Sequence, residues 1–132
     1  MLNYTYYNAN PKNRKTGDCS TRALVGVLGI TYEQALREQT EESLKCYYDP
    51  SSKQVIERVL KNHGFVKHAQ PRKADGTKYL AGEIDKVVSS EDLYNGVLIT
   101  VANHHIAVKG ITLLDTWDSR SKCIGNYYTK AK

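Results

Sequence analysis

The sequence predicts an α+β fold in which N-terminal helices pack on a C-terminal antiparallel sheet. Apolar residues recur at three- and four-residue spacings between Cys19 and Gly64, whereas β-branched and aromatic residues dominate from Gly96 onward. Helices followed by strands are typical of α+β domains. The chain has 132 residues, so we expect a single domain that spans residues 1–132.

Residues 1–17 are expected to form an extended N-terminal arm, because they show no hydrophobic period and contain Pro11. Directly after the arm, helical spacing of apolar residues predicts a short helix over 19–28, and Gly29 is expected to end it. Cys19 would then lie at a helix N-terminus.

Two further helices are expected in the first half of the chain. A Thr31-x-x-Gln34 capping pattern begins one that runs to about residue 47, and Ser52 begins another that ends at Gly64. The residues assigned to the inner side of the earlier helix are Tyr32, Ala35, Leu36 and Leu44.

The remaining elements are a short strand, a loop, a fourth helix and four further strands. Residues 65–68 predict the strand, 71–76 the loop and 77–88 the helix. The four C-terminal strands are expected over residues 97–102, 104–110, 111–117 and 123–128.

Composition and charge narrow the classes of function. No apolar run approaches the ~20 residues that span a bilayer, and the N-terminus lacks the pattern of a secretory signal, so we expect a cytoplasmic protein without a membrane partner. Three cysteines cannot pair completely and match no structural zinc spacing, which predicts free thiols. The net charge of +5 is scattered in small groups, which favours a solvated surface over a nucleic-acid interface.

Cys19 is the candidate nucleophile. At a helix N-terminus a thiol meets exposed backbone N–H groups and the positive end of the helix dipole, and both favour the thiolate. The alternative reading of its position is a small buried thiol that begins an apolar helix.

His104 and Asp115 are the candidate partners of this thiol. His104 opens an alternating strand, and Asp115 follows eleven residues later. If 104–110 and 111–117 form a tight hairpin, both side chains lie at its open end, as a Cys–His–Asp relay requires.

Two neighbouring residues, His105 and Asp118, are alternative candidates. His105 alternates with His104 and is expected to face the opposite side of the strand, which argues against a metal ion shared by both rings. Asp118 is the rival orienting carboxylate, although an aspartate in that position is typical of a turn cap. Neither a metal nor a cofactor is expected.

Three motifs support a family resemblance. Asp18-Cys19 opens a helix with Ala23-Leu24 after it, His104 opens a strand that reaches Gly110 six residues later, and Asp115-Thr116-Trp117 follows. These motifs resemble the papain-like cysteine peptidase superfamily, especially its compact bacterial branch with the leader peptidases of bacteriocin exporters. The whole sequence, with Asn-Pro-Lys at 10–12, Thr-Gly-Asp-Cys at 16–19 and Asp-Thr-Trp-Asp at 115–118, is also similar to short uncharacterised phage and prophage proteins of Gram-positive hosts.

The resemblance implies a papain-like fold and a set of residue roles. It makes Cys19 the nucleophile, His104 the base and Asp115 the carboxylate that orients the base. Trp117 would shield the His–Asp pair from water. These families place an oxyanion-donating glutamine six residues before the nucleophile, where this sequence has Asn13, and Asn10 competes for that role. Ser20 stands where papain has an aromatic residue, and the Cys–His spacing is shorter than in papain, which implies a trimmed domain.

The expected function is therefore thiol-dependent hydrolysis of an amide or isopeptide bond in a protein or peptide substrate, in the host cytoplasm if the chain is phage encoded. Deamidation or transamidation would use the same site and stays open. A non-catalytic binding module for a host protein or nucleic acid, on the same scaffold, is the alternative class.

Overall fold

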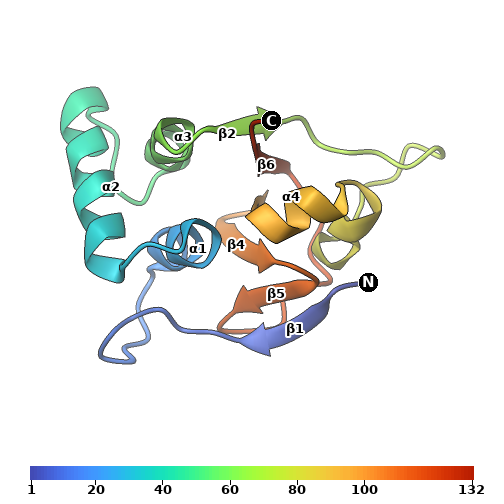
Figure 1. Ribbon diagram of the computed structural model, residues 1–132, viewed down its shortest axis with the longest axis horizontal. Coiled ribbons are helices and arrows are strands. Elements are labelled where there is room, and N and C mark those ends of the chain that lie inside the picture. The colour runs from blue at the N-terminus through green and yellow to red at the C-terminus, as the bar shows by residue number, and fades with distance from the viewer.

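The computed structural model describes residues 1–132 and confirms the α+β class (Figure 1). The elements in chain order are β1 (Asn3–Tyr6), α1 (Cys19–Leu28), α2 (Tyr32–Cys46), α3 (Lys53–Asn62), β2 (Phe65–His68), the 3₁₀-helix η1 (Ala81–Lys86), α4 (Ser90–Asn95), β3 (Val97–Val101), β4 (His104–Lys109), β5 (Thr112–Asp115) and β6 (Asn126–Lys130). The strands form one six-stranded sheet, the central layer, in the order β1-β5-β4-β3-β6-β2. None of the helices is both long and apolar enough to cross a bilayer.

The sheet is mixed, which corrects the expected antiparallel sheet. Four neighbouring strand pairs are antiparallel, but β1 runs parallel to β5, with Asn3 opposite Thr112 and Tyr6 opposite Asp115. The expectation of an arm over 1–17 is therefore wrong for residues 3–6. This strand is only four residues long and mostly exposed, and its partner lies near the other end of the chain, so no local pattern indicates it.

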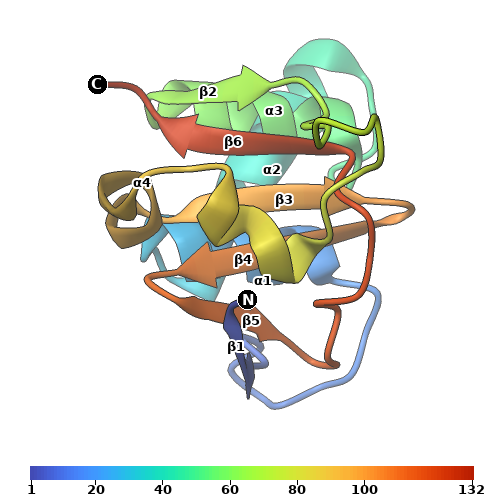
Figure 2. The ribbon, with the colours of Figure 1, turned by 90° about the vertical axis from the view of Figure 1, so that its right-hand side faces the viewer.

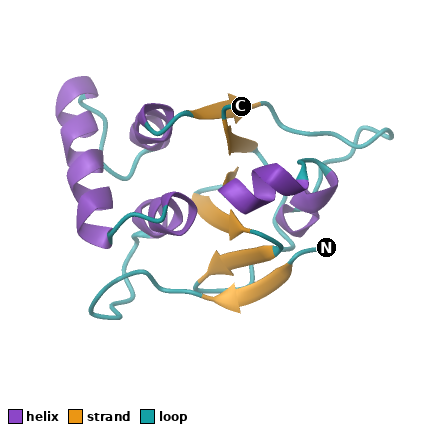
Figure 3. Ribbon diagram, in the orientation of Figure 1, coloured by secondary structure: helices purple, strands orange, loops and turns teal.

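Helices cover both faces of the sheet (Figures 2 and 3). In Figure 2 the sheet is seen from the side of η1 and α4, with α1, α2 and α3 behind it, and Figure 3 shows the same layers from the edge. Alternation along β4 serves both layers, because Ala107 belongs to the core under α1 while Ile106 and Val108 belong to the core under η1.

Helix α1 lies directly on the sheet. A Cβ atom built on Gly26 would come within 2.7 Å of the Ala107 Cβ in β4, so only glycine permits this approach. Gly29 ends the helix in the left-handed region at φ 68°, as predicted. The close contact fixes the position of Cys19, the first residue of α1, relative to β4.

The second helix begins as predicted but turns a different face inward. Thr31 Oγ1 accepts a hydrogen bond from the Gln34 N–H at 3.1 Å. Leu36 and Leu44, however, are 45% and 69% exposed, which contradicts their assignment to the inner side. Helix α2 packs on α1 and α3 instead of the sheet, and part of its inner face is polar: Gln39 is 2% exposed and accepts a hydrogen bond from Thr21 at 2.9 Å.

The helix expected over 77–88 is shortened to the 3₁₀-helix η1, and an unpredicted helix, α4, follows it. Residues 78 and 80 are held extended by bridges to Arg72 and Cys123, so a helix cannot begin before Ala81. Helix α4 begins at a capping box in which Ser89 accepts the Asp92 N–H at 3.1 Å. That Ser-x-x-Asp pattern is visible in the sequence and indicates the missed helix. Strand β2, helix α3 and the four C-terminal strands are confirmed, with shifted ends.

Candidate active site

The β4–β5 hairpin brings His104 and Asp115 together. Its register pairs Lys109 with Thr112 and Ala107 with Leu114, which leaves the first residue of β4 and the last of β5 at the open end. His104 Nε2 donates a hydrogen bond to Asp115 Oδ2 at 2.6 Å. The predicted hairpin is therefore confirmed, and the sequence interval of eleven residues becomes a direct contact.

Cys19 reaches the same imidazole from α1. Burial raises the pKa of the Cys19 thiol, but the neighbouring His104 imidazole and His105 backbone N–H, with the charges of His104 and Arg22, outweigh burial and hold the pKa below its ordinary value. Because His104 Nε2 is bound to Asp115, its Nδ1 is the nitrogen left for the thiol.

The pKa of the His104 imidazole is shifted in the opposite direction, upward. Burial lowers the pKa of His104, but hydrogen bonds and charges of Asp115 and Cys19 outweigh burial and raise the pKa to about 9. A lowered thiol pKa and a raised imidazole pKa favour a thiolate–imidazolium pair at neutral pH. This is the protonation state in which a thiol is nucleophilic.

Asp115 is 1% exposed and is surrounded by hydrogen-bond donors. Besides His104, the Ser119 hydroxyl donates to Oδ2 at 2.7 Å, and the Thr116 N–H and Arg22 Nη1 donate to Oδ1 at 2.7 and 3.1 Å. Burial raises the pKa of Asp115, but the contacts with His104 and Ser119 outweigh it and lower the pKa. The carboxylate therefore stays charged and can hold the imidazole in one orientation.

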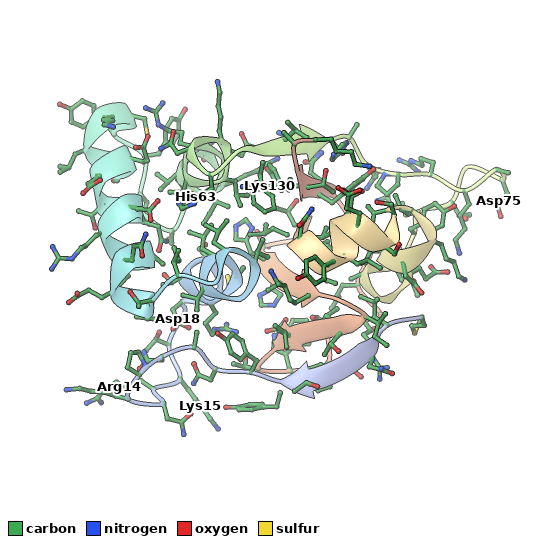
Figure 4. The ribbon with its side chains drawn as sticks, in the orientation of Figure 1. Arg14, Lys15, Asp18, His63, Asp75 and Lys130 are labelled. Atoms are coloured by element: carbon green, nitrogen blue, oxygen red, sulfur yellow. The ribbon has the colours of Figure 1, made fainter.

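Arg22 ties the start of α1 to the end of β5. Its Nε binds Asp18 Oδ1 at 2.8 Å while its Nη1 binds Asp115 Oδ1 at 3.1 Å, and its side chain is only 9% exposed. Tyr32 donates to the other Asp18 oxygen at 2.7 Å. Asp18, which is labelled in Figure 4, is the N-cap residue of α1. It makes no capping hydrogen bond to the helix.

Trp117 and Asp118 follow the carboxylate on the way out of β5. The ring centroids of Trp117 and His104 lie 5.0 Å apart, tilted by 36°, so the indole covers one side of the imidazole. Asp118 points to Arg120, accepting from Nε at 2.9 Å and from Nη2 at 2.7 Å, and also accepts the Arg120 N–H at 3.2 Å. Asp118 therefore caps the turn, and Asp115 is the carboxylate on the imidazole.

A cleft of about 550 Å³ opens beside Cys19 and contains both histidines of β4. The cleft lies at the end of β4, where Asn103 turns the chain at φ 55°, and residues of successive positions in the strand line it. Burial, with the charges of His104 and Lys53, lowers the pKa of His105 to about 4. Its Nδ1 is buried without a hydrogen-bond partner, so the ring is neutral and held by packing.

The structure does not bring Asn13 or Asn10 to this cleft, which corrects the oxyanion assignment. Asn13 is exposed, and its side-chain oxygen accepts a hydrogen bond from Asn8 at 3.4 Å. Asn10 donates its side-chain amide to the Tyr32 hydroxyl at 3.5 Å and accepts the Asn13 N–H with its carbonyl. The arm folds into a turn on itself, so sequence distance from Cys19 does not indicate proximity.

Sequence reasoning missed Arg22 and Ser119. A lone arginine within the apolar helix pattern that follows Cys19 is a usable signal, since buried arginines require acidic partners. No local pattern indicates Ser119.

All three cysteines are free, and no group of three His, Cys, Asp or Glu side chains could hold a metal ion. Neither the family models nor the curated proteins nor the solved structures contain a match to this chain.

Proposed function

We propose that this chain is a papain-like thiol hydrolase that cleaves an amide or isopeptide bond in a protein or peptide substrate. One observation carries the proposal: a thiol from α1 and an imidazole from β4 line the same open cleft, and a carboxylate from β5 binds that imidazole. A buried cysteine at a helix start would need none of these partners. The opposed pKa directions of Cys19 and His104 support the same reading.

In the proposed reaction the Cys19 thiolate attacks the carbonyl carbon of the substrate. A C–S bond forms, and the π electrons of the carbonyl move to its oxygen. As the C=O bond is restored, the C–N bond breaks and the amine leaves with the proton of the His104 imidazolium. Water then attacks the thioester, His104 takes its proton, and the acid is released with thiolate and imidazolium restored.

The negative oxygen of the intermediate needs hydrogen-bond donors that Asn13 does not supply. The first-turn N–H groups of α1 have no intrahelical acceptors, and the side chain of Asp18 does not cap them. We assign oxyanion stabilisation to these N–H groups, Cys19 first among them. Asp18 is held away from them by Arg22 and Tyr32.

Selective alkylation tests the proposal without knowledge of the substrate. At pH ~6 an ordinary cysteine of pKa about 8.5 is less than ~1% ionised, so iodoacetamide alkylates it slowly. Cys19 should nevertheless be modified before Cys123, although Cys123 is exposed and Cys19 is half-buried. Peptide mass mapping identifies the modified residue, and His104→Ala should abolish the preference. Faster labelling of Cys123 in the folded protein would contradict the proposal and favour the non-catalytic binding module.

A further inference from the structure

We propose that the cleft selects a substrate segment that carries a carboxylate close to the scissile bond, and that Lys53 binds this carboxylate. The inference deepens the proposed function and rests on it. It follows from the charge of the cleft, the position of Lys53 and the state of the neighbouring groups.

The cleft wall is polar and contains no acidic residue. None of its 13 lining residues is Asp or Glu, and Lys53 is the only Lys or Arg among them. Of the nearby carboxylates, Asp115 is occupied by His104 and Arg22, and Asp18 by Arg22 and Tyr32. A substrate carboxylate would therefore meet two cations, Lys53 and the His104 imidazolium, and no fixed negative side chain other than the reacting thiolate.

Lys53 is available for such a contact. Its ammonium lies 3.2 Å from Asn126 Oδ1, a neutral acceptor, and it forms no ion pair. Glu57, one turn further along α3, feels the charge of Lys53, but its direct partners are Lys67 and the Tyr128 hydroxyl, both at 2.8 Å. A lysine with only an amide oxygen as its partner keeps most of its attraction for an anion.

The lysine is held beside the nucleophile by a contact between helices. Ser20, the residue after Cys19, donates a hydrogen bond to the Ser51 carbonyl at 2.7 Å. This contact fixes the N-terminal end of α3, where Lys53 is the first helical residue, next to the N-terminal end of α1. Asn126 is in turn anchored, donating to the His68 carbonyl at 3.2 Å.

The other basic groups of the cleft leave this role to Lys53. His105 is neutral, since burial and its cationic neighbours lower its pKa to about 4. His104 is charged, but its charge is matched by the Cys19 thiolate and by Asp115. Lys53 is therefore the one positive side chain of the cleft without a direct ion-pair partner, and replacing it isolates its contribution to carboxylate binding.

Matched electrophilic peptides test the inference. Tripeptide acyloxymethyl ketones alkylate activated thiols, and each probe with Glu at one position has a counterpart with Gln. We expect Cys19 to react faster with a Glu probe by about two- to fivefold, the value of a solvent-accessible ion pair. The difference should shrink in about 0.5 M NaCl, because salt screens exposed charges.

Three variants assign the effect to one residue. Lys53→Gln should remove the preference for Glu, and Lys53→Arg should retain it. Lys61→Gln makes the same change of net charge on the last turn of α3, outside the cleft, and should leave the preference unchanged. Mass mapping of Cys19 in each protein gives the rates.

The Gln probe separates the two proposals. If it modifies Cys19 faster than Cys123 but no Glu probe exceeds it, or if the Glu preference survives Lys53→Gln, the carboxylate inference is wrong and the thiol site stands. If no probe modifies Cys19 faster than Cys123, the proposed function fails and the inference fails with it.

Discussion

Replacing Arg22 with Met should destabilise the fold and impair the candidate site together. The guanidinium pairs with Asp18 and Asp115, whose side chains are 10% and 1% exposed. Removing one partner of a buried ion pair costs ~3–5 kcal/mol. Both carboxylates keep other donors, Tyr32 for Asp18 and three groups for Asp115. We therefore expect a loss of about 2–4 kcal/mol in the free energy of unfolding.

Urea unfolding at neutral pH measures this loss, and Arg58→Met is the matched control. Arg58 binds Glu42 at 2.9 Å and is 44% exposed, and the buried Glu42 keeps Lys45 at 3.2 Å, so removal of Arg58 should cost only about 1 kcal/mol. In a domain of this size 1 kcal/mol corresponds to about 3–5 °C in melting temperature. The Arg22 variant should thus melt about 10 °C below wild type.

A second readout separates anchoring from general destabilisation. The charge of Arg22 contributes to the lowered pKa of Cys19, so Arg22→Met should slow the alkylation of Cys19 at pH ~6 under conditions where the variant is folded. Arg58→Met should leave that rate unchanged. An unfolding loss equal to that of Arg58→Met, or an unchanged alkylation rate at Cys19, would refute this account of the guanidinium.

Two further predictions concern the hairpin and the helix that lies on it. Asp115→Asn should lower the pKa of His104 from about 9 toward 6.5, so the imidazolium is lost at a lower pH than in wild type. Asp118→Asn should leave the pKa of His104 unchanged. An NMR titration of the His104 ring measures the pKa in both variants. Gly26→Ala should destabilise the protein by ~1–3 kcal/mol through overpacking against β4, and Gly17→Ala, which meets nothing within 4 Å, is the thermal-melt control that should remain near wild type.

The parts of the site that sequence predicts are those set by local patterns. The period of 19–28 and the stop at Gly29 place Cys19 at a helix start, and alternation on either side of Gly110 makes the hairpin that joins His104 to Asp115. Each of these features depends on residues close in sequence. The sequence therefore predicts the position of the thiol and the hairpin separately, without information on the distance between them.

The parts that sequence does not predict depend on distant partners. Residues 3–6 become a strand only because β5 offers an unpaired edge. Leu36 and Leu44 show helical spacing, yet they are exposed because the buried face of α2 includes Gln39 instead. Asn13 has the expected sequence interval to Cys19, but the arm turns on itself before reaching the cleft.

Asp115 makes two kinds of contact, one proposed to be catalytic and one structural, and a mutational test of the proposed chemistry must separate them. Its Oδ2 orients His104, while its Oδ1 accepts from Arg22 and so anchors α1 to the sheet. Truncation to alanine would remove both contacts, and a loss of reactivity would then report on folding as much as on the imidazole. Cys19→Ser changes one atom and leaves the contacts of Asp115 with His104 and Arg22 in place. Loss of all acyl transfer in that variant, with an unchanged melting temperature, is therefore the result that would assign the chemistry to the thiol.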